Sequence, residues 1–125
     1  MVKDDLKYTE THEWLKIEDK VATIGITDYA QNELGDIVFV DLPDIETELE
    51  QEEVLATIEA VKAVEEIYSP ISGIVLEVNE NLEDNSELIN SNPFEEGWIA
   101  KIEITNPDDL ENLLSSNEYR KLVGE

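Results

Sequence analysis

The chain has 125 residues, and its 32 Asp and Glu residues against 8 Lys and Arg residues give a formal net charge of −24 at pH 7. This negative field repels nucleic acid and anionic membrane surfaces, so we expect neither as a partner. The chain contains no cysteine, which excludes disulfides, thiolate metal sites and a protein thiol nucleophile. Its length and apolar fraction of 41% favour a single folded domain over residues 1–125.

The acidity has two explanations that composition does not separate: basic partner proteins, or a salt-rich cell in which excess carboxylates keep the surface hydrated. Residues 1–6 lack the apolar segment of a secretory signal and the basic composition of a transit peptide. No apolar run approaches the length that spans a membrane. We therefore expect a cytoplasmic protein, and the mutual repulsion of two such chains favours a monomer.

Short strand-like segments dominate the chain between residues 21 and 104. They are rich in β-branched or aromatic residues, are separated by turn-forming residues, and cover 21–26, 37–41, 54–58, 73–78 and 98–104. After the first of them, Thr27 is placed to cap a helix over 28–34, and Gly35 is placed to end it. The pattern predicts a mainly β fold, a small sandwich with a short internal helix.

The C-terminal part carries a second helical signal. Asn106 precedes Pro107 and two acids, which is typical of a helix start, and leucines follow at helical spacing. We expect a helical segment over about 107–123, in which a second turn of helix around 118–123 closes the chain and places Tyr119 and Leu122 against the sandwich.

Catalytic residue types are scarce. With one histidine, no cysteine and no serine in a histidine–acid context, the chain is not expected to be an enzyme. Asn79, Asn81 and Glu83 imitate the start of a calcium loop. Asp84 replaces the turn glycine of that loop, and Asn90 replaces its bidentate glutamate. We therefore expect no metal site of this type.

Lys62 lies in the most informative local segment, between two strand-like runs. The tip residues Val61, Lys62 and Ala63 differ from the Gly, Asn, Asp and Pro of ordinary turns, so something other than turn formation favours this sequence. On spacing alone, a surface lysine that compensates nearby acids such as Glu59 and Glu65 is the simpler interpretation.

Several short blocks, taken together in their order and spacing, change that interpretation. They are THEW (11–14), VATIGIT (21–27), GDIVFV (35–40), LP (42–43), EAVKA (59–63), SPISG (69–73), NPF (92–94) and GW (97–98). Through these blocks, nearly the whole chain resembles the glycine cleavage system H-protein family, whose members carry lipoate.

The resemblance implies that Lys62 carries lipoate as lipoyl-lysine, on a barrel-sandwich hybrid of antiparallel strands finished by a C-terminal helix. In the family, the arm takes the aminomethyl group of glycine from a pyridoxal-phosphate-dependent glycine decarboxylase to a tetrahydrofolate-dependent aminomethyltransferase. Dihydrolipoyl dehydrogenase then reoxidises the arm, which a lipoate ligase or a lipoyl/octanoyl transferase has attached. The expected role is that of a non-catalytic carrier.

His12 and Glu13 lie in a block that the resemblance places near the loaded arm. Glu13 is the stronger candidate contact because a charged aminomethyl group favours a carboxylate neighbour; a surface acid is the alternative. For His12, a structural hydrogen-bonding role is the simpler interpretation. Trp14 and Trp98 are expected to anchor the core.

The chain departs from the family at several positions. Ala60 stands where many members have serine, and Glu46, Glu52 and Ala56 stand where glycine is common. A lost hydroxyl and lost permissive turns alter the surface that a modifying enzyme meets. A specialised lipoyl relay, which serves other enzymes or a regulatory system, is therefore an alternative to glycine cleavage.

Other carriers and one non-carrier also compete. Biotinyl domains resemble this fold but flank their lysine with methionines, where this chain has Val61 and Ala63. Lipoyl domains of 2-oxoacid dehydrogenases commonly place aspartate before the lysine and end sooner. An unmodified scaffold protein that binds partners through its acidic surface is the alternative from a different class.

Overall fold

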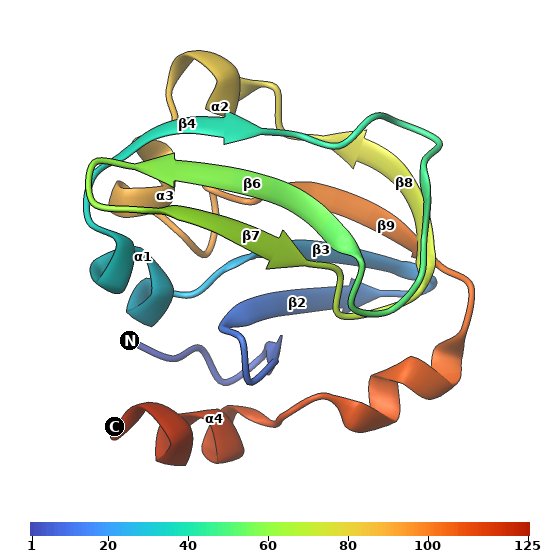
Figure 1. Ribbon diagram of the computed structural model, residues 1–125. Helices are drawn as coiled ribbons and strands as arrows, with labels where there is room; N and C mark the ends of the chain where they lie inside the picture. The colour runs from blue at the N-terminus through green and yellow to red at the C-terminus, as the bar shows by residue number, and fades with distance from the viewer.

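The computed structural model describes residues 1–125, which form two antiparallel sheets and several short helices (Figure 1). The strands are β1 (Lys7–Tyr8), β2 (Glu13–Glu18), β3 (Val21–Ile26), β4 (Ile37–Asp41), β5 (Glu48–Leu49), β6 (Val54–Ala60), β7 (Val64–Tyr68), β8 (Gly73–Val78) and β9 (Ala100–Ile104). The larger sheet has the order β1-β2-β3-β9-β8-β5, and the smaller one has the order β4-β6-β7. The two sheets face each other, as expected for a sandwich.

The sequence pattern predicts the long apolar strands and not the short or charged ones. The predicted segments 21–26, 37–41 and 73–78 coincide with β3, β4 and β8. In β2, charged residues at both ends obscure the strand signal, although the strand pairs with β3 from Glu13↔Ile26 to Glu18↔Val21. The two-residue strands β1 and β5 are too short to produce a periodic signal.

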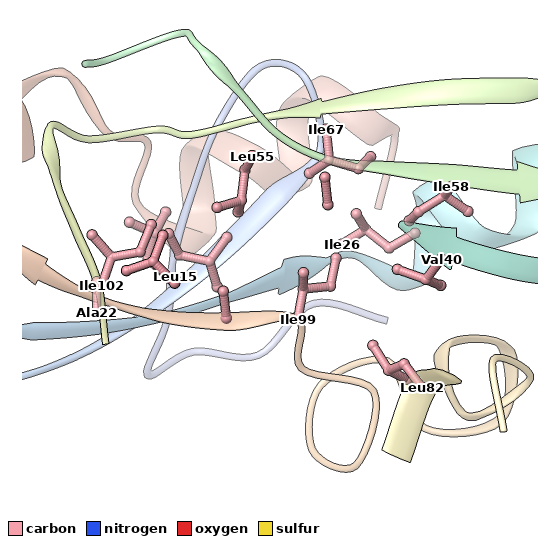
Figure 2. Close-up of a cluster of buried hydrophobic side chains, with 14 of the residues drawn as sticks. Leu15, Ala22, Ile26, Val40, Leu55, Ile58, Ile67, Leu82, Ile99 and Ile102 are labelled. Carbon is pink, nitrogen blue, oxygen red and sulfur yellow. The ribbon is translucent and has the colours of Figure 1, made fainter. Parts of the chain in front are cut away.

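The hydrophobic core lies between the two sheets (Figure 2). In the larger sheet, alternate residues of β3, namely Ala22, Ile24 and Ile26, are buried, as the period of two in a strand requires. Ile58 and Ile67 of the smaller sheet meet them from the other side. Full burial of each such isoleucine contributes about 1.5–3 kcal/mol to folding.

The internal helix α1 (Asp28–Leu34) has the predicted bounds and caps. Thr27 Oγ1 accepts a hydrogen bond from Ala30 N, and Gly35 N donates to the carbonyl of Gln31. The single-turn helices α2 (Asn81–Asp84) and α3 (Leu88–Ser91) are additional elements that the sequence pattern does not predict. They occupy the segment that imitates a calcium loop, and they bury Leu82 and Ile89.

The C-terminal segment folds as two separate helices, and the second covers the helical turn expected around 118–123. A 3₁₀ helix η1 (Pro107–Asn112) follows the predicted Asn106 cap, and α4 (Ser116–Val123) begins at a new cap. Between them, Leu114 makes a bridge to Tyr8, which holds the chain extended. None of the helices is long and apolar enough to span a membrane.

A second, smaller core forms where α4 covers β1 and β2. Tyr119 is buried and stacks on Tyr8 with ring centroids 4.5 Å apart, as predicted for a packed residue. Leu122, expected to pack as well, is instead 49% exposed because α4 presents only one face to the sheet. Trp14 is a buried anchor of this cluster, whereas Trp98 is half-buried at its edge.

Candidate functional site

Lys62 lies at the tip of the hairpin that joins β6 to β7, at one end of the smaller sheet (Figure 1). Within the tip, Ala60 N donates to the Ala63 carbonyl at 2.8 Å. Val61 N donates out of the hairpin to the Asp36 carbonyl, at 2.9 Å, just before β4. Val61, Lys62 and Ala63 are all exposed, so the predicted exposed hairpin tip is confirmed.

The Lys62 amine forms no ion pair, although the flanking strands carry the exposed acids Glu59, Glu65 and Glu66. Its alkyl chain packs on Gly35. Lys62 Cε lies 3.4 Å from the position that a Cβ on Gly35 would occupy. An amine that is exposed and unpaired can be reached by an acyl donor without any rearrangement of the sheet. The site therefore fits a lipoyl group in amide linkage.

Apolar side chains lie exposed on the same sheet as Lys62. Val61 and Val64 at the hairpin tip are 73% and 63% exposed. On the neighbouring strand β4, Val38 and Phe39 are both exposed although they are consecutive, because a register shift between Ile37 and Phe39 interrupts the alternation of faces. Together with the nearby acids, they make a surface that is apolar and negative.

Glu13 is buried, with 1% of its surface exposed, so the alternative that it is a surface acid is wrong. Thr9 Oγ1 and Thr11 Oγ1 both donate to Glu13 Oε1, at 2.7 and 2.6 Å. Burial raises the pKa of the carboxyl to about 7 in spite of these bonds, and the charge of Glu65 on β7 raises it further. The carboxyl lines a cleft of about 280 Å³, which Tyr68 also borders.

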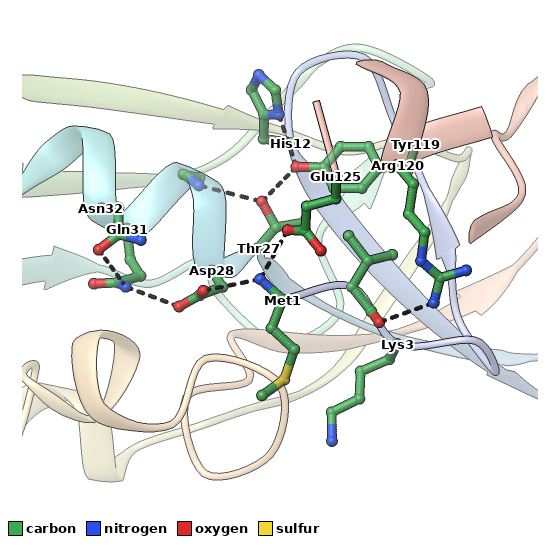
Figure 3. Close-up of polar contacts among 12 residues, drawn as sticks. Met1, Lys3, His12, Thr27, Asp28, Gln31, Asn32, Tyr119, Arg120 and Glu125 are labelled. Carbon is green, nitrogen blue, oxygen red and sulfur yellow. Dashed lines mark hydrogen bonds and ion pairs between the residues drawn. The ribbon is translucent and has the colours of Figure 1, made fainter. Parts of the chain in front are cut away.

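His12 faces a different set of neighbours from Glu13 (Figure 3). Its Nδ1 lies 2.8 Å from Tyr119 Oη, which also lies 2.7 Å from Thr27 Oγ1, and its ring lies against Tyr29. Burial lowers the pKa of the imidazole. The residue has φ of +70°, in the left-handed region. These contacts tie α4 to the start of α1, which confirms a structural hydrogen-bonding role for His12.

Comparisons with known proteins extend over nearly the whole chain. The family model described as Glycine cleavage H-protein matches residues 6–125. The chain belongs to this family. A glycine cleavage system H protein of Staphylococcus epidermidis is 53% identical over 99% of this chain and 98% of its own, and one of Staphylococcus carnosus is 48% identical over the same shares.

A solved structure of a family member supports the same assignment. The crystal structure of a glycine cleavage system H protein from Mycobacterium marinum is similar with a TM-score of 0.90 and 31% identity, and the match covers 99% of this chain and 100% of that one. The predicted barrel-sandwich fold is confirmed by this similarity. Membership of the family makes the chain a carrier component of the glycine cleavage system and not a catalytic subunit.

The structure brings Lys62 into contact with Gly35, and Gly35 into contact with Asn90, two residues that the sequence pattern does not assign to the site. Gly35 was interpretable only as a helix end, yet it lies under the lysine side chain. Asn90, considered only as a failed calcium ligand, donates to the Gly35 carbonyl at 2.9 Å. By contrast, no hydrogen bond joins Lys62 to His12 or Glu13, whose contacts lie elsewhere.

Proposed function

We propose that this chain is the lipoyl carrier of a glycine cleavage system, with lipoate joined through an amide bond to Lys62 Nζ. The observation that carries the proposal is an exposed lysine without an ion pair, at a hairpin tip between Val61 and Ala63, in a chain of the H-protein family. The hairpin rests on a paired sheet, so the origin of the arm is fixed while the arm itself moves.

The lipoyl group, when bound, supplies a disulfide that accepts the aminomethyl group of glycine and is restored by oxidation. Acylation of Lys62 removes one positive charge and takes the formal net charge from −24 to −25. The chain has no thiol that could attack that disulfide and trap the arm. The protein thus contributes position and a non-competing surface, and the cofactor contributes the chemistry.

The proposed partners act on the arm in sequence. A pyridoxal-phosphate-dependent glycine decarboxylase loads it, a tetrahydrofolate-dependent aminomethyltransferase unloads it, and dihydrolipoyl dehydrogenase reoxidises it, after a lipoate ligase or lipoyl/octanoyl transferase has attached it. The apolar side chains of Val61 and Val64 and the acids beside them support docking to surfaces with an apolar centre and a basic rim.

Glu13 is the proposed contact for the charged, loaded arm. Its carboxyl lies at a cleft and has a pKa of about 7, so a nearby ammonium group would shift it to the ionised form and gain a charge-assisted hydrogen bond. Glu65, whose charge contributes to the raised pKa of Glu13, lies on β7, the strand that leaves the Lys62 hairpin, which supports a location of the Glu13 carboxyl on the side of the arm.

The test is to co-express the chain with a lipoate ligase, supply lipoate, and measure the intact mass. Cleavage after glutamate releases peptide 60–65, which contains Lys62 as its one lysine. We expect a single lipoyl adduct, confined to this peptide. A biotin adduct in this peptide would show that the lysine carries biotin instead of lipoate. The proposal would be contradicted if no adduct formed under conditions that modify a known lipoyl domain.

A matched pair of variants separates a carrier from a scaffold. Lys62→Arg keeps the charge but cannot be acylated, whereas Lys20→Arg makes the same change at the exposed turn between β2 and β3. We expect the first variant to lose all glycine-cleavage activity in the reconstituted system, and the second to keep it. Activity retained in Lys62→Arg would favour the unmodified scaffold.

A further inference from the structure

Asn90 of α3 connects several parts of the chain next to the Lys62 hairpin. Its Nδ2 donates to the Gly35 carbonyl and to Gln31 Oε1, each at 2.9 Å, and its Oδ1 accepts from Ile37 N at 2.9 Å. Every one of these contacts goes to α1 or to the segment that runs from α1 into β4. The Asn90 side chain therefore fixes the path of residues 35–37.

Gly35, which accepts one of these bonds, has an unusual backbone conformation. Its φ of 78° and ψ of −156° lie in a region that essentially only glycine occupies. The alkyl chain of Lys62 packs on it, within contact distance of the position that a Cβ would take. The hydrogen bond from Asn90 to the Gly35 carbonyl holds the peptide unit on which the lysine rests.

The adjoining residues transmit this support to the hairpin tip. Val61 N donates to the Asp36 carbonyl at 2.9 Å, the one backbone hydrogen bond that ties the tip to another part of the chain. Ile37 pairs with Ala60 at the start of the β4–β6 ladder. A shift of residues 35–37 would therefore move Val61, and with it the lysine that follows.

We propose that Asn90 is a positioning residue for the lipoyl attachment site. By holding Gly35 and Ile37 it holds Asp36 and the tip, so that the Lys62 amine is presented in one place to the enzyme that acylates it. This role rests on the proposed function, because the group presented is the lysine that carries lipoate. Asn90 acts through the backbone and touches neither the amine nor the arm.

The test compares Asn90→Ala with Asn79→Ala. Asn79 is also an asparagine whose Nδ2 donates two hydrogen bonds, but these go to the carbonyls of Glu96 and Trp98 and not to residues 35–37 or to the hairpin. Two quantities are measured on the full chain: kcat/KM for lipoylation by a purified lipoate ligase, and the amide hydrogen-exchange rate of Val61.

We expect Asn90→Ala to lower kcat/KM by about tenfold, because displacement of a reacting group slows its reaction. Exchange at Val61 should be faster by a similar factor, because the Asp36 carbonyl that accepts its amide proton is held less firmly. Asn79→Ala should change each quantity less than about twofold, even if it lowers stability equally. If Asn90→Ala does not fold, Asn90→Asp serves instead, because it keeps the acceptor for Ile37 N and removes both donors.

The outcomes separate the two proposals. Normal lipoylation and unchanged Val61 exchange in the Asn90 variant would overturn the positioning role while leaving the carrier function intact. Equal losses in the Asn79 variant would also overturn it, because they would reduce it to general stability. A wild-type chain that accepts no lipoate would overturn the carrier function itself, and the positioning role with it.

Discussion

Glu13 has a pKa of about 7 in the folded chain, and this makes stability depend on pH in a way that one substitution isolates. An unfolded glutamate has a pKa of about 4.5, so folding favours the protonated form, and the native state loses stability as the pH rises from 4.5 through 7. At about 1.36 kcal/mol for each pH unit, the ionised carboxyl destabilises the fold by about 3 kcal/mol above pH 7. Glu13→Gln keeps the shape and removes this effect.

The measurement is the free energy of unfolding in urea, for the wild type and Glu13→Gln, between pH 4 and pH 9. The other carboxyls are the same in both proteins, so the difference between the two curves reports Glu13 alone. We expect the variant to match the wild type within about 1 kcal/mol near pH 4.5 and to exceed it by about 3 kcal/mol at pH 8. A difference that stays constant with pH would refute the argument that burial governs this carboxyl.

Other predictions concern backbone strain, the C-terminal helix and charge. Glu52 has φ of +75°, so Glu52→Gly should be more stable than Glu52→Gln by about 0.5–1 kcal/mol in urea titrations, and equal stability would contradict the strain. Tyr119→Phe loses the hydroxyl between His12 and Thr27 and should lower the free energy of unfolding by about 1–2 kcal/mol; an unchanged Tm would count against that network. The rate of lipoylation should fall as the ionic strength rises from about 0.05 to about 0.5 M, because salt screens the charge of the chain. A rate that does not change with salt would contradict electrostatic steering.

The departures from the family pattern acquire a physical meaning in the structure. Glu46 and Glu52, which stand where glycine is common, both have φ of +75°, a conformation that glycine adopts without strain. Both are exposed, and the amide of each donates a 2.7 Å backbone hydrogen bond, to Val75 and Ser69 respectively. The fold therefore keeps the left-handed turns without the glycines, at a cost in stability that the Glu52 variants measure.

Local sequence signals were sufficient for part of the site. The cap at Thr27, the stop at Gly35 and the tip at Lys62 each depend on a few neighbouring residues, and the structure has all of them where the pattern predicts. Such local signals do not predict the environment of Glu13. Thr9 and Thr11 donate hydrogen bonds to its carboxyl, and the charge on β7 that helps to raise its pKa lies more than fifty residues away in the sequence.

The sequence by itself determined the periodic strands and the first helix, because alternation and capping act over a few residues. Only the tertiary structure decided that Asn90 supports Gly35 from fifty-five positions away, and that α4 closes a second core over Trp14. Hydrogen bonds of that span depend on how the sheets and helices pack, and packing leaves no local trace in a single sequence.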